Sequence, residues 1–323
     1  MSKVILVTGG SGFIGSHICD QLIENDNTVI CIDNLLTGSQ KNIAHLLTKP
    51  NFHFFKQDAC KPFKSKKFTK IDEIYHLASP ADPNVNSPFS YMSHPFETMK
   101  VNTEGTWNLC ELAVKHNSKF IFSSTSEIYG NPEKSPQDEQ YRGNVSTTSP
   151  RSVYDESKRF GETIVSAFVR EKRLDARITR IFNTYGPRMN LKEGRAVVNF
   201  IKQALSNEPI TIYGDGKQTR SFCYIDDQVR GQIVSMNKGK TGEIFNIGNP
   251  DERSIIDFAE IIKRLTRSKS IIKFSQELPE DDPLQRKPDI SKAKKNLGWE
   301  PLIGLEAGLE KTIRYFKNEL NLR

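Results

Sequence analysis

The first forty residues contain a glycine-rich turn that leaves few folds open. A four-residue apolar run, Val4–Val7, precedes the sequence TGGSGFIG (residues 8–15), and a segment with apolar residues at helical spacing follows. Gly9, Gly12 and Gly15 leave the turn without Cβ atoms, so a phosphate group can approach the backbone amides at the start of a helix. A strand, a glycine turn and a helix in this order predict a dinucleotide-binding βαβ unit.

An acidic residue that can bind a ribose lies 18 positions after Gly15. Asp33 closes the second apolar run, Val29–Ile32. A carboxylate at this place accepts hydrogen bonds from both ribose hydroxyls of an adenosine and repels the 2′-phosphate of NADP. The neighbouring Asn34 and Leu35 provide no arginine to pair with such a phosphate. The sequence therefore predicts NAD as the cofactor.

Apolar runs typical of buried strands alternate with amphipathic segments through the first half of the chain. This alternation predicts the α/β class, as a Rossmann-type doubly wound parallel sheet with helices on both faces. After about residue 183 the elements become shorter and less regular, which predicts a smaller C-terminal α/β lobe. We therefore expect an NAD-binding domain over 1–182 and a lobe over 183–323 that mainly binds substrate, with some segments returning to the sheet. The expected strands are 4–7, 29–32, 52–55, 74–77, 120–123, 178–182, 210–213 and 244–247, and helices are expected at 255–266 and 305–316.

Composition excludes several classes of protein. Hydrophobic residues make up 36% and charged residues 26% of the 323 residues, and no apolar stretch approaches the roughly 20 residues that span a bilayer. The N-terminus lacks the pattern of a secretory leader, so we expect a cytoplasmic protein. The net charge of +7 is spread along the chain without interleaved aromatic residues, which argues against nucleic-acid binding. Neither the five cysteines nor the six histidines have metal-ligand or disulfide spacing, so no metal is expected.

Tyr154 and Lys158 are four residues apart, which makes them neighbours on one face of a helix. A second Tyr–Lys pair at this spacing, Tyr213 and Lys217, spans two glycines and therefore belongs to a turn. Only the first pair begins an amphipathic helix. Its phenol and ammonium are candidate catalytic groups.

The electrostatics of this pair permit a phenolate base. A tyrosine pKa near 10 must fall by about three units, or about 4 kcal/mol, for the phenol to ionise at pH 7. One positive charge about 4 Å away contributes roughly that much at an effective dielectric constant of about 20. Lys158, together with an oxidised nicotinamide, is sufficient in principle to make Tyr154 a base.

These features resemble the extended short-chain dehydrogenase/reductase family, whose members act on nucleotide sugars. The resemblance extends over nearly the whole chain and includes the glycine turn, Asp33, Asp58-Ala59, Tyr154-x-x-x-Lys158 and Thr125-Ser126-Glu127. Within this family, the UDP-glucuronate decarboxylases, also called UDP-xylose synthases, are similar in a more specific set of motifs. That set is HLASPA at 76–81, TSEIYG at 125–130, IFNTYGPRM at 181–189, QTR at 218–220 and RKPDI at 286–290.

The resemblance implies a redox-neutral decarboxylation. Tyr154 would take the proton of the C4 hydroxyl of UDP-glucuronate while NAD+ takes the hydride, and the 4-ketone formed lies β to the C6 carboxylate, which leaves as CO2. Return of the hydride would give UDP-xylose. Three alternatives stay open: a decarboxylase that releases the ketopentose, a UDP-sugar 4-epimerase, and an NAD-sensing protein without catalysis. Ser126 stands where the family's 4,6-dehydratases carry an acidic residue, which argues against dehydration.

The resemblance also implies residue roles and a homodimer through helices at about 98–116 and 154–170. Thr125 would orient the C4 hydroxyl or the phenolate, Glu127 would be a proton shuttle or electrostatic partner, and Arg286 would act on the carboxylate or in reprotonation of C5. Arginine forks also suit a diphosphate. The expected cofactor-binding residues are Gly9, Gly12, Phe13, Ile14, Gly15, Asp33, Asn34, Thr37, Gly38, Asp58, Ala59, Leu77, Lys100, Tyr154 and Lys158. The expected substrate-binding residues are Ser79, Asn183, Arg188, Arg195, Tyr213, Gln218, Arg220 and Arg286.

Overall fold

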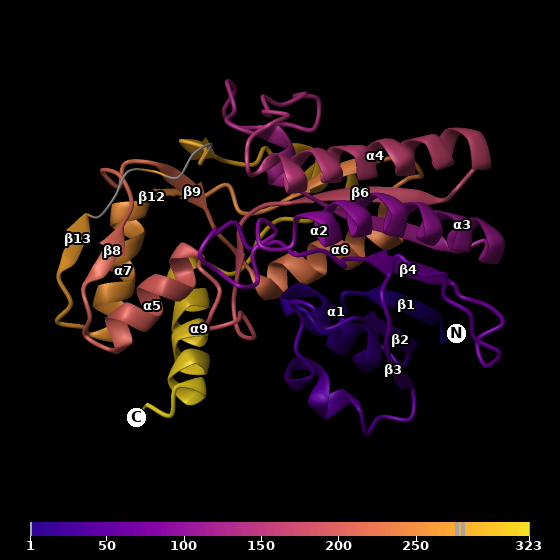
Figure 1. The fold of residues 1–323 in the computed structure, drawn as a ribbon, viewed down its shortest axis with the longest axis horizontal. Helices are drawn as coiled ribbons and strands as arrows, with labels where there is room; N and C mark the ends of the chain where they lie inside the picture. Colours follow the sequence, from indigo (N-terminus) through magenta and orange to yellow (C-terminus); the bar gives the residue numbers. More distant parts are fainter. Residues whose placement is uncertain (1, 275–277, 279–281, 323) are drawn as a thin grey trace.

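A seven-stranded sheet runs through the larger part of the computed structural model, which describes residues 2–274, 278 and 282–322 (Figure 1). The spatial order is β11-β6-β5-β4-β1-β2-β3, and every neighbouring pair is parallel. Its strands are β1 (Val4–Thr8), β2 (Thr28–Asp33), β3 (Phe52–Lys56), β4 (Glu73–His76), β5 (Lys119–Thr125), β6 (Ala176–Ile181) and β11 (Ile244–Ile247). The strand order reverses between β1 and β4, which confirms the predicted Rossmann-type sheet and places a crevice at their carboxyl ends.

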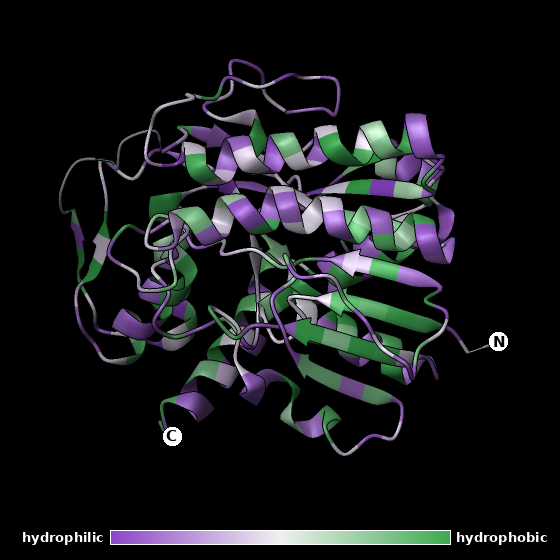
Figure 2. Cartoon of the chain, turned by 45° about the vertical axis from the view of Figure 1, so that its right-hand side comes forward, coloured by the Kyte–Doolittle hydropathy of each residue, from purple (hydrophilic) through white to green (hydrophobic). Residues whose placement is uncertain are grey.

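Helices cover both faces of this sheet. Because side chains alternate along a strand, Ile5 and Val7 of β1 pack in one core cluster while Leu6 lies in another. The first cluster includes apolar residues of α1 (Phe13–Glu24), and the second includes those of α3 (Thr106–His116) and α4 (Ser152–Lys172). Figure 2 shows the resulting hydrophobic strands beneath helices of mixed polarity.

The segment predicted as one helix at about 98–116 has three parts. These are α2 (Pro95–Lys100), a π-helical turn (Val101–Gly105) and α3. Within the wide turn, Asn102 is buried and donates a hydrogen bond to Ser157 of α4 at 3.0 Å, and the Thr106 hydroxyl donates to the Asn102 carbonyl at 2.7 Å. Such side-chain bonds stabilise a local departure from α-helical geometry.

A smaller lobe follows residue 183. It contains α5 (Ala196–Leu205), α7 (Ile255–Thr266) and α9 (Leu305–Glu319), whose apolar faces share a core in which the Phe222 and Phe258 rings stack at 4.0 Å. Short strands pair around it: β8 (Ile210–Ile212) with β13 (Ile272–Phe274), β9 (Thr219–Ser221) with β12 (Glu252–Ser254) and β14 (Gln285–Arg286), and β7 (Thr184–Tyr185) with β10 (Cys223–Tyr224).

The chain passes between the lobes more than once. α6 (Ile225–Lys238) packs on β5, β6 and β11, and α8 (Ser291–Leu297) packs on β11, so these late segments lie with the large sheet. Ile244–Ile247 is one of the segments that return to the sheet, where it forms the edge strand beside β6.

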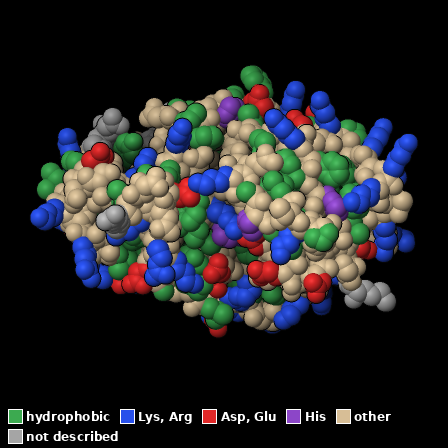
Figure 3. All heavy atoms as spheres, turned by 90° about the horizontal axis from the view of Figure 1, so that it is seen from below, with side chains coloured by type: hydrophobic (Ala, Val, Ile, Leu, Met, Phe, Trp, Pro, Cys, Tyr) green, Lys and Arg blue, Asp and Glu red, His purple; other side chains and the backbone are tan. Residues whose placement is uncertain are grey.

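The described residues contain no helix with the length and apolar character needed to cross a membrane. They also contain no group of three or more His, Cys, Asp or Glu side chains placed to hold a metal ion. On the face shown in Figure 3, Lys and Arg side chains are scattered with Asp and Glu between them and form no single basic stripe.

Candidate active site

A cavity of about 1140 Å³ lies between the two lobes and is lined by both. The volume exceeds the 300–1,000 Å³ typical of a site for one small molecule, so it can hold two nucleotides. It contains every predicted cofactor-binding residue and all predicted substrate-binding residues except Arg286. Arg286 is buried behind the wall, where it contacts Glu127 and the Gly130 carbonyl.

The glycine turn forms one end of the cavity. Gly9 has φ of +72°, and a Cβ there would lie 2.7 Å from the Ala78 nitrogen, while a Cβ on Gly15 would lie 2.1 Å from the Gly9 oxygen. Glycine is therefore required at both positions. Helix α1 begins directly after Gly12 without a side-chain cap, so its first amides face the cavity as donors for an anion.

Asp33 lies at the end of β2, beside this turn. Its two carboxylate oxygens accept hydrogen bonds from the Ser11 amide at 2.9 Å and the Leu35 amide at 2.8 Å. Burial raises the pKa of Asp33, and these two amides oppose the shift. The fixed carboxylate lines the cavity next to Gly38, and at this position a carboxylate can accept hydrogen bonds from ribose hydroxyls.

Tyr154 and Lys158 project from the first turns of α4 into the cavity wall. Lys158 is buried and donates to the Ser123 carbonyl at 2.8 Å, with its nitrogen 5.9 Å from the centre of the Tyr154 ring. Burial lowers the pKa of Lys158 to about 7. Burial also raises the pKa of Tyr154, although a hydrogen bond with the Thr125 hydroxyl and the charge of Arg195 oppose it. The sequence predicted that Lys158, together with an oxidised nicotinamide, lowers the phenol pKa, but in the protein without cofactor burial raises the pKa of Tyr154 instead.

A second tyrosine supports the first. The rings of Tyr91 and Tyr154 are stacked, with centroids 4.8 Å apart and planes 6° apart. Tyr91 is buried, lines the cavity, and its hydroxyl has no hydrogen-bond partner among the described residues. Nothing in the sequence pointed to Tyr91, because its place depends on the path of the loop between β4 and α2.

Glu127 lies between two arginines, just after β5. Its two carboxylate oxygens accept hydrogen bonds from Arg151 and Arg286, respectively. Burial alone would raise the pKa of Glu127, but the charges of Arg151 and Arg286 outweigh it and hold the value at about 2. Glu127 is therefore a carboxylate at neutral pH, which favours the predicted role of electrostatic partner over that of proton shuttle.

The sequence analysis missed Arg151 and Asp282, which complete this network. Arg151 is buried at the start of α4 and also pairs with Asp282 at 3.3 Å. Asp282 in turn accepts a hydrogen bond from Arg220 at 2.8 Å. In the sequence, only the position of Arg151, three residues before Tyr154 at the start of a helix, could have indicated a role in the site. No sequence feature indicated such a role for Asp282.

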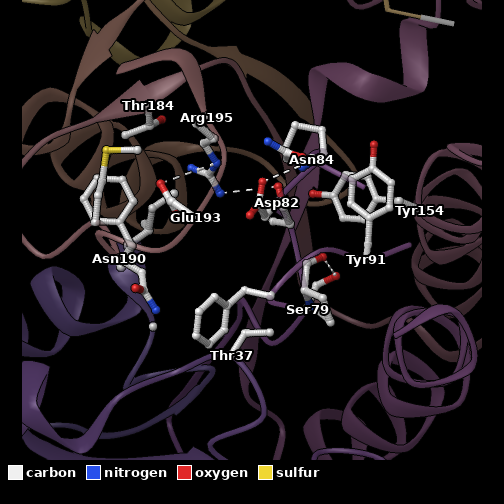
Figure 4. Close-up of a pocket in the computed structure, with 18 of the residues that line it drawn as sticks. Thr37, Ser79, Asp82, Asn84, Tyr91, Tyr154, Thr184, Asn190, Glu193 and Arg195 are labelled. Atoms are coloured by element: carbon white, nitrogen blue, oxygen red, sulfur yellow. Dashed lines mark hydrogen bonds and ion pairs between the residues drawn. The ribbon is translucent and has the colours of Figure 1, made fainter. Parts of the chain in front are cut away.

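Of the remaining predicted substrate residues, Ser79 lines the cavity from the loop after β4, and the others line it from the second lobe or its edge. Gln218 donates to the Tyr213 carbonyl at 2.9 Å, and both line the cavity, as does Asn183. Arg188 lines it too, but its guanidinium pairs with Asp20 of α1 at 2.7 Å. Figure 4 shows Arg195 close to Glu193 and to the loop that carries Asp82.

A doubly wound sheet with a glycine turn and an acidic residue at the end of its second strand defines the dinucleotide-binding class of protein, and the Tyr154–Lys158 pair in the same cavity supplies groups for proton transfer. A model of the NAD dependent epimerase/dehydratase family matches residues 5–248. The chain belongs to this family, and its cofactor is NAD.

Similar proteins narrow the class further. The chain is 46% identical over 98% of its length to a UDP-glucuronic acid decarboxylase 1 of Xenopus tropicalis, of which it covers 73%. It is 48% identical over 94% of its length to UDP-glucuronic acid decarboxylase 6 of Arabidopsis thaliana, of which it covers 86%. It also resembles the structure of a UDP-glucuronic acid 4-epimerase from Bacillus cereus in complex with a UDP-4-deoxy-4-fluoro-glucuronic acid and NAD, with a TM-score of 0.83 and 33% identity over 98% of this chain and 99% of that one.

Proposed function

We propose that this chain decarboxylates UDP-glucuronate to UDP-xylose through a 4-keto intermediate and regenerates NAD within each turnover. The relatives with 46–48% identity act, by name, on UDP-glucuronic acid and remove its carboxyl group. The fold alone does not separate this reaction from 4-epimerisation, because a glucuronic acid epimerase shares it.

One observation carries the proposal: Arg151 and Arg286 hold an ionised Glu127 close to Tyr154. With a pKa of about 2, Glu127 cannot protonate a leaving hydroxyl, and neighbouring Ser126 is no acid either. Dehydration therefore lacks its proton donor. The Arg151 guanidinium in the cavity wall suits a substrate that carries a carboxylate.

The chain's own groups have the following tasks in this reaction. Bound NAD supplies the hydride acceptor and donor at C4. Ionised Tyr154 takes the proton from the C4 oxygen, which requires the positive charges of Lys158 and the bound nicotinamide because burial raises the phenol pKa. The 4-ketone then allows loss of CO2 from C5 without further chemistry from the protein. Arg151, which lines the cavity, orients the carboxylate, and Arg286 keeps Glu127 ionised from behind the cavity wall.

Product analysis tests this proposal. Incubation with UDP-glucuronate should yield UDP-xylose and CO2 at equal amounts without net NADH, as followed by NMR and by absorbance at 340 nm. Release of a UDP-ketopentose with stoichiometric NADH, formation of UDP-galacturonate, or no turnover would each overturn it. Tyr154→Phe should lower kcat by about 10²–10⁴-fold, the usual contribution of a positioned base, while NAD binding is retained.

The two lobes divide the ligands in this proposal. Residues 1–182 hold NAD through the glycine turn and Asp33, and residues 183–323 mainly hold the UDP-sugar. Support comes from the cavity, since its second-lobe wall presents Arg195, Arg220 and Gln218 opposite the nucleotide turn.

We further propose a homodimer through α3 and α4. Trp107 and Phe160 are 50% and 56% exposed on these helices, and Val114 is 39% exposed. Exposed aromatic residues on adjacent helices are typical of an interface. Light scattering should give twice the 36.7 kDa chain mass, and the double variant Trp107→Glu/Phe160→Glu should give the monomer mass.

A cytoplasmic location is part of this proposal. All five cysteines are free thiols, and four are buried. Unpaired thiols suit a reducing compartment.

A further inference from the structure

A cluster of charged groups in the cavity wall joins two loops. The loop after β4 contributes Asp82, and the loop before α5 contributes Glu193 and Arg195 (Figure 4). Asp82 accepts a hydrogen bond from the Gly194 amide at 3.1 Å, and the Arg195 guanidinium donates to the Ala81 carbonyl at 3.3 Å. The cluster therefore ties the first-lobe wall of the cavity to the second-lobe wall.

Glu193 is poorly satisfied in this cluster. It is only 8% exposed, and its Oε1 lies 3.8 Å from Arg195 Nε, too far for a hydrogen bond. No other donor among the described residues reaches Oε1. A buried carboxylate oxygen without a donor is costly, and a proton on the carboxyl group relieves that cost.

The charges that face Glu193 are Arg195 and Asp82. Arg195 in turn faces the carboxyl groups of Glu193, Asp82 and Glu127, so several acidic side chains share one cation. A nucleotide diphosphate that enters the cavity adds further negative charge and competes for the same guanidinium.

We propose that Glu193 is a proton-coupled positioning residue. When a diphosphate pairs with the Arg195 guanidinium, it replaces Glu193 in the ion pair, and the Glu193 carboxylate then takes up a proton from solution. No covalent step is involved, since the proton adds to Glu193 and the ion pair changes partner. The inference rests on the proposed function only in assuming that the cavity takes nucleotide diphosphates, which NAD and a UDP-sugar both contain.

The sign of the pH dependence follows from linkage. Burial raises the pKa of Glu193 in the free protein to about 7, and a neighbouring diphosphate must raise it further. The bound state then holds more protons than the free state above pH 7, so affinity falls as the pH rises, by at most about tenfold per pH unit.

Isothermal titration calorimetry in pairs of buffers with different ionisation enthalpies measures this proton uptake directly. NAD and UDP-glucose are titrated separately at pH 7.5, because neither has a diphosphate that titrates there and UDP-glucose has no carboxylate to lose. Lys158 and other groups also titrate, so the decisive quantity is the difference between wild type and Glu193→Gln. Glu208→Gln, at an exposed position after α5, is the matched control.

With at least one of the two ligands, wild type and Glu208→Gln should take up about half a proton more than Glu193→Gln, and their affinity should fall about 3–10-fold more between pH 7 and 8.5. The ligand that shows the difference is the one whose diphosphate pairs with Arg195. Equal uptake in all three proteins with both ligands would overturn the inference and leave the proposed function intact. Failure of UDP-glucose to bind at all would instead contradict the proposed function.

If Glu193→Gln does not fold, Asp82→Asn tests the inference. Removing the negative charge of Asp82 should lower the pKa of Glu193 and so move the fall in affinity to lower pH. An unchanged pH profile would contradict the coupling.

Discussion

Tyr91 lies face to face with Tyr154, with 4.8 Å between ring centres and an angle of 6° between ring planes. The loop between β4 and α2 thus covers one face of the phenol on α4. Because the Tyr91 hydroxyl lacks a partner among the described residues, the contribution of the ring can be separated from that of the hydroxyl.

We expect Tyr91→Phe to keep the stack and Tyr91→Leu to lose it. Stacking of an aromatic pair contributes about 0.5–1.5 kcal/mol beyond burial, so Tyr91→Leu should unfold more easily than Tyr91→Phe by at least about 1 kcal/mol. Its kcat should be at least about tenfold lower than that of Tyr91→Phe, because the base is no longer held in place. Urea unfolding and steady-state kinetics measure the two effects, and equal kcat values would show that the stack does not position Tyr154.

Because of Lys158, the stability of the folded protein should increase as the pH rises above 7. Its pKa is about 7 when folded, below that of an unfolded lysine, so between about pH 7 and 10.5 the unfolded chain binds the extra proton. The free energy of unfolding should therefore rise with pH over this window, by at most about 1.4 kcal/mol per unit. In Lys158→Met this rise should be absent. Urea unfolding at pH 6.5 to 9.5 compares the two proteins, and parallel curves would contradict the assignment.

Glu127→Gln leaves Arg151 and Arg286 without their shared carboxylate. Removal of one partner from a buried ion pair typically costs about 3–5 kcal/mol, and we expect a loss of about 3 kcal/mol in unfolding free energy at pH 7. Since the pKa of Glu127 is lowered to about 2, this stabilisation is present above about pH 4.5 and is lost as the pH falls toward 2. The control is Glu156→Gln on α4, a half-exposed partner of Arg159 that should change stability by less than about 0.5 kcal/mol. A similar small loss in both variants would mean that the arginines are neutralised elsewhere.

Asp33→Ser should weaken the binding of NAD and reduce the selectivity for NAD over NADP. A hydrogen bond to a charged group contributes about 1.5–3 kcal/mol, so Kd for NAD should rise about 10–100-fold. Kd for NADP should change less or fall, because the repulsion of its 2′-phosphate is removed. Fluorescence titration with both cofactors gives the ratio, with Glu24→Gln at the exposed end of α1 as a control. An unchanged ratio would assign the discrimination to another group.

Features set by local sequence could be predicted. The glycine turn, Asp33 and the Tyr154–Lys158 pair each depend on a strand end, a turn or one helical face, and the structure brings them to one cavity. The α7 range at Ile255–Thr266 is the predicted one, because its caps and periodicity agree.

Features set by contacts between distant loops could not be predicted. Tyr91, Asp82 and Glu193 acquire their roles from how two loops meet, and no spacing in the sequence records that. The protonation states of Tyr154 and Lys158 could not be predicted either, because their pKa values depend on how deeply the side chains are buried.

Strand β11 has one more implication for work with fragments. It pairs with β6 along the outer edge of the main sheet, yet it comes 63 residues later in the chain than the end of β6, after much of the second lobe has been made. A truncated protein that stops at residue 182 would therefore leave backbone N–H and C=O groups of β6 unpaired at the sheet edge, which favours strand pairing between molecules. Attempts to express the nucleotide-binding half by itself should yield precipitate, and a useful deletion series must keep residues 244–247 attached.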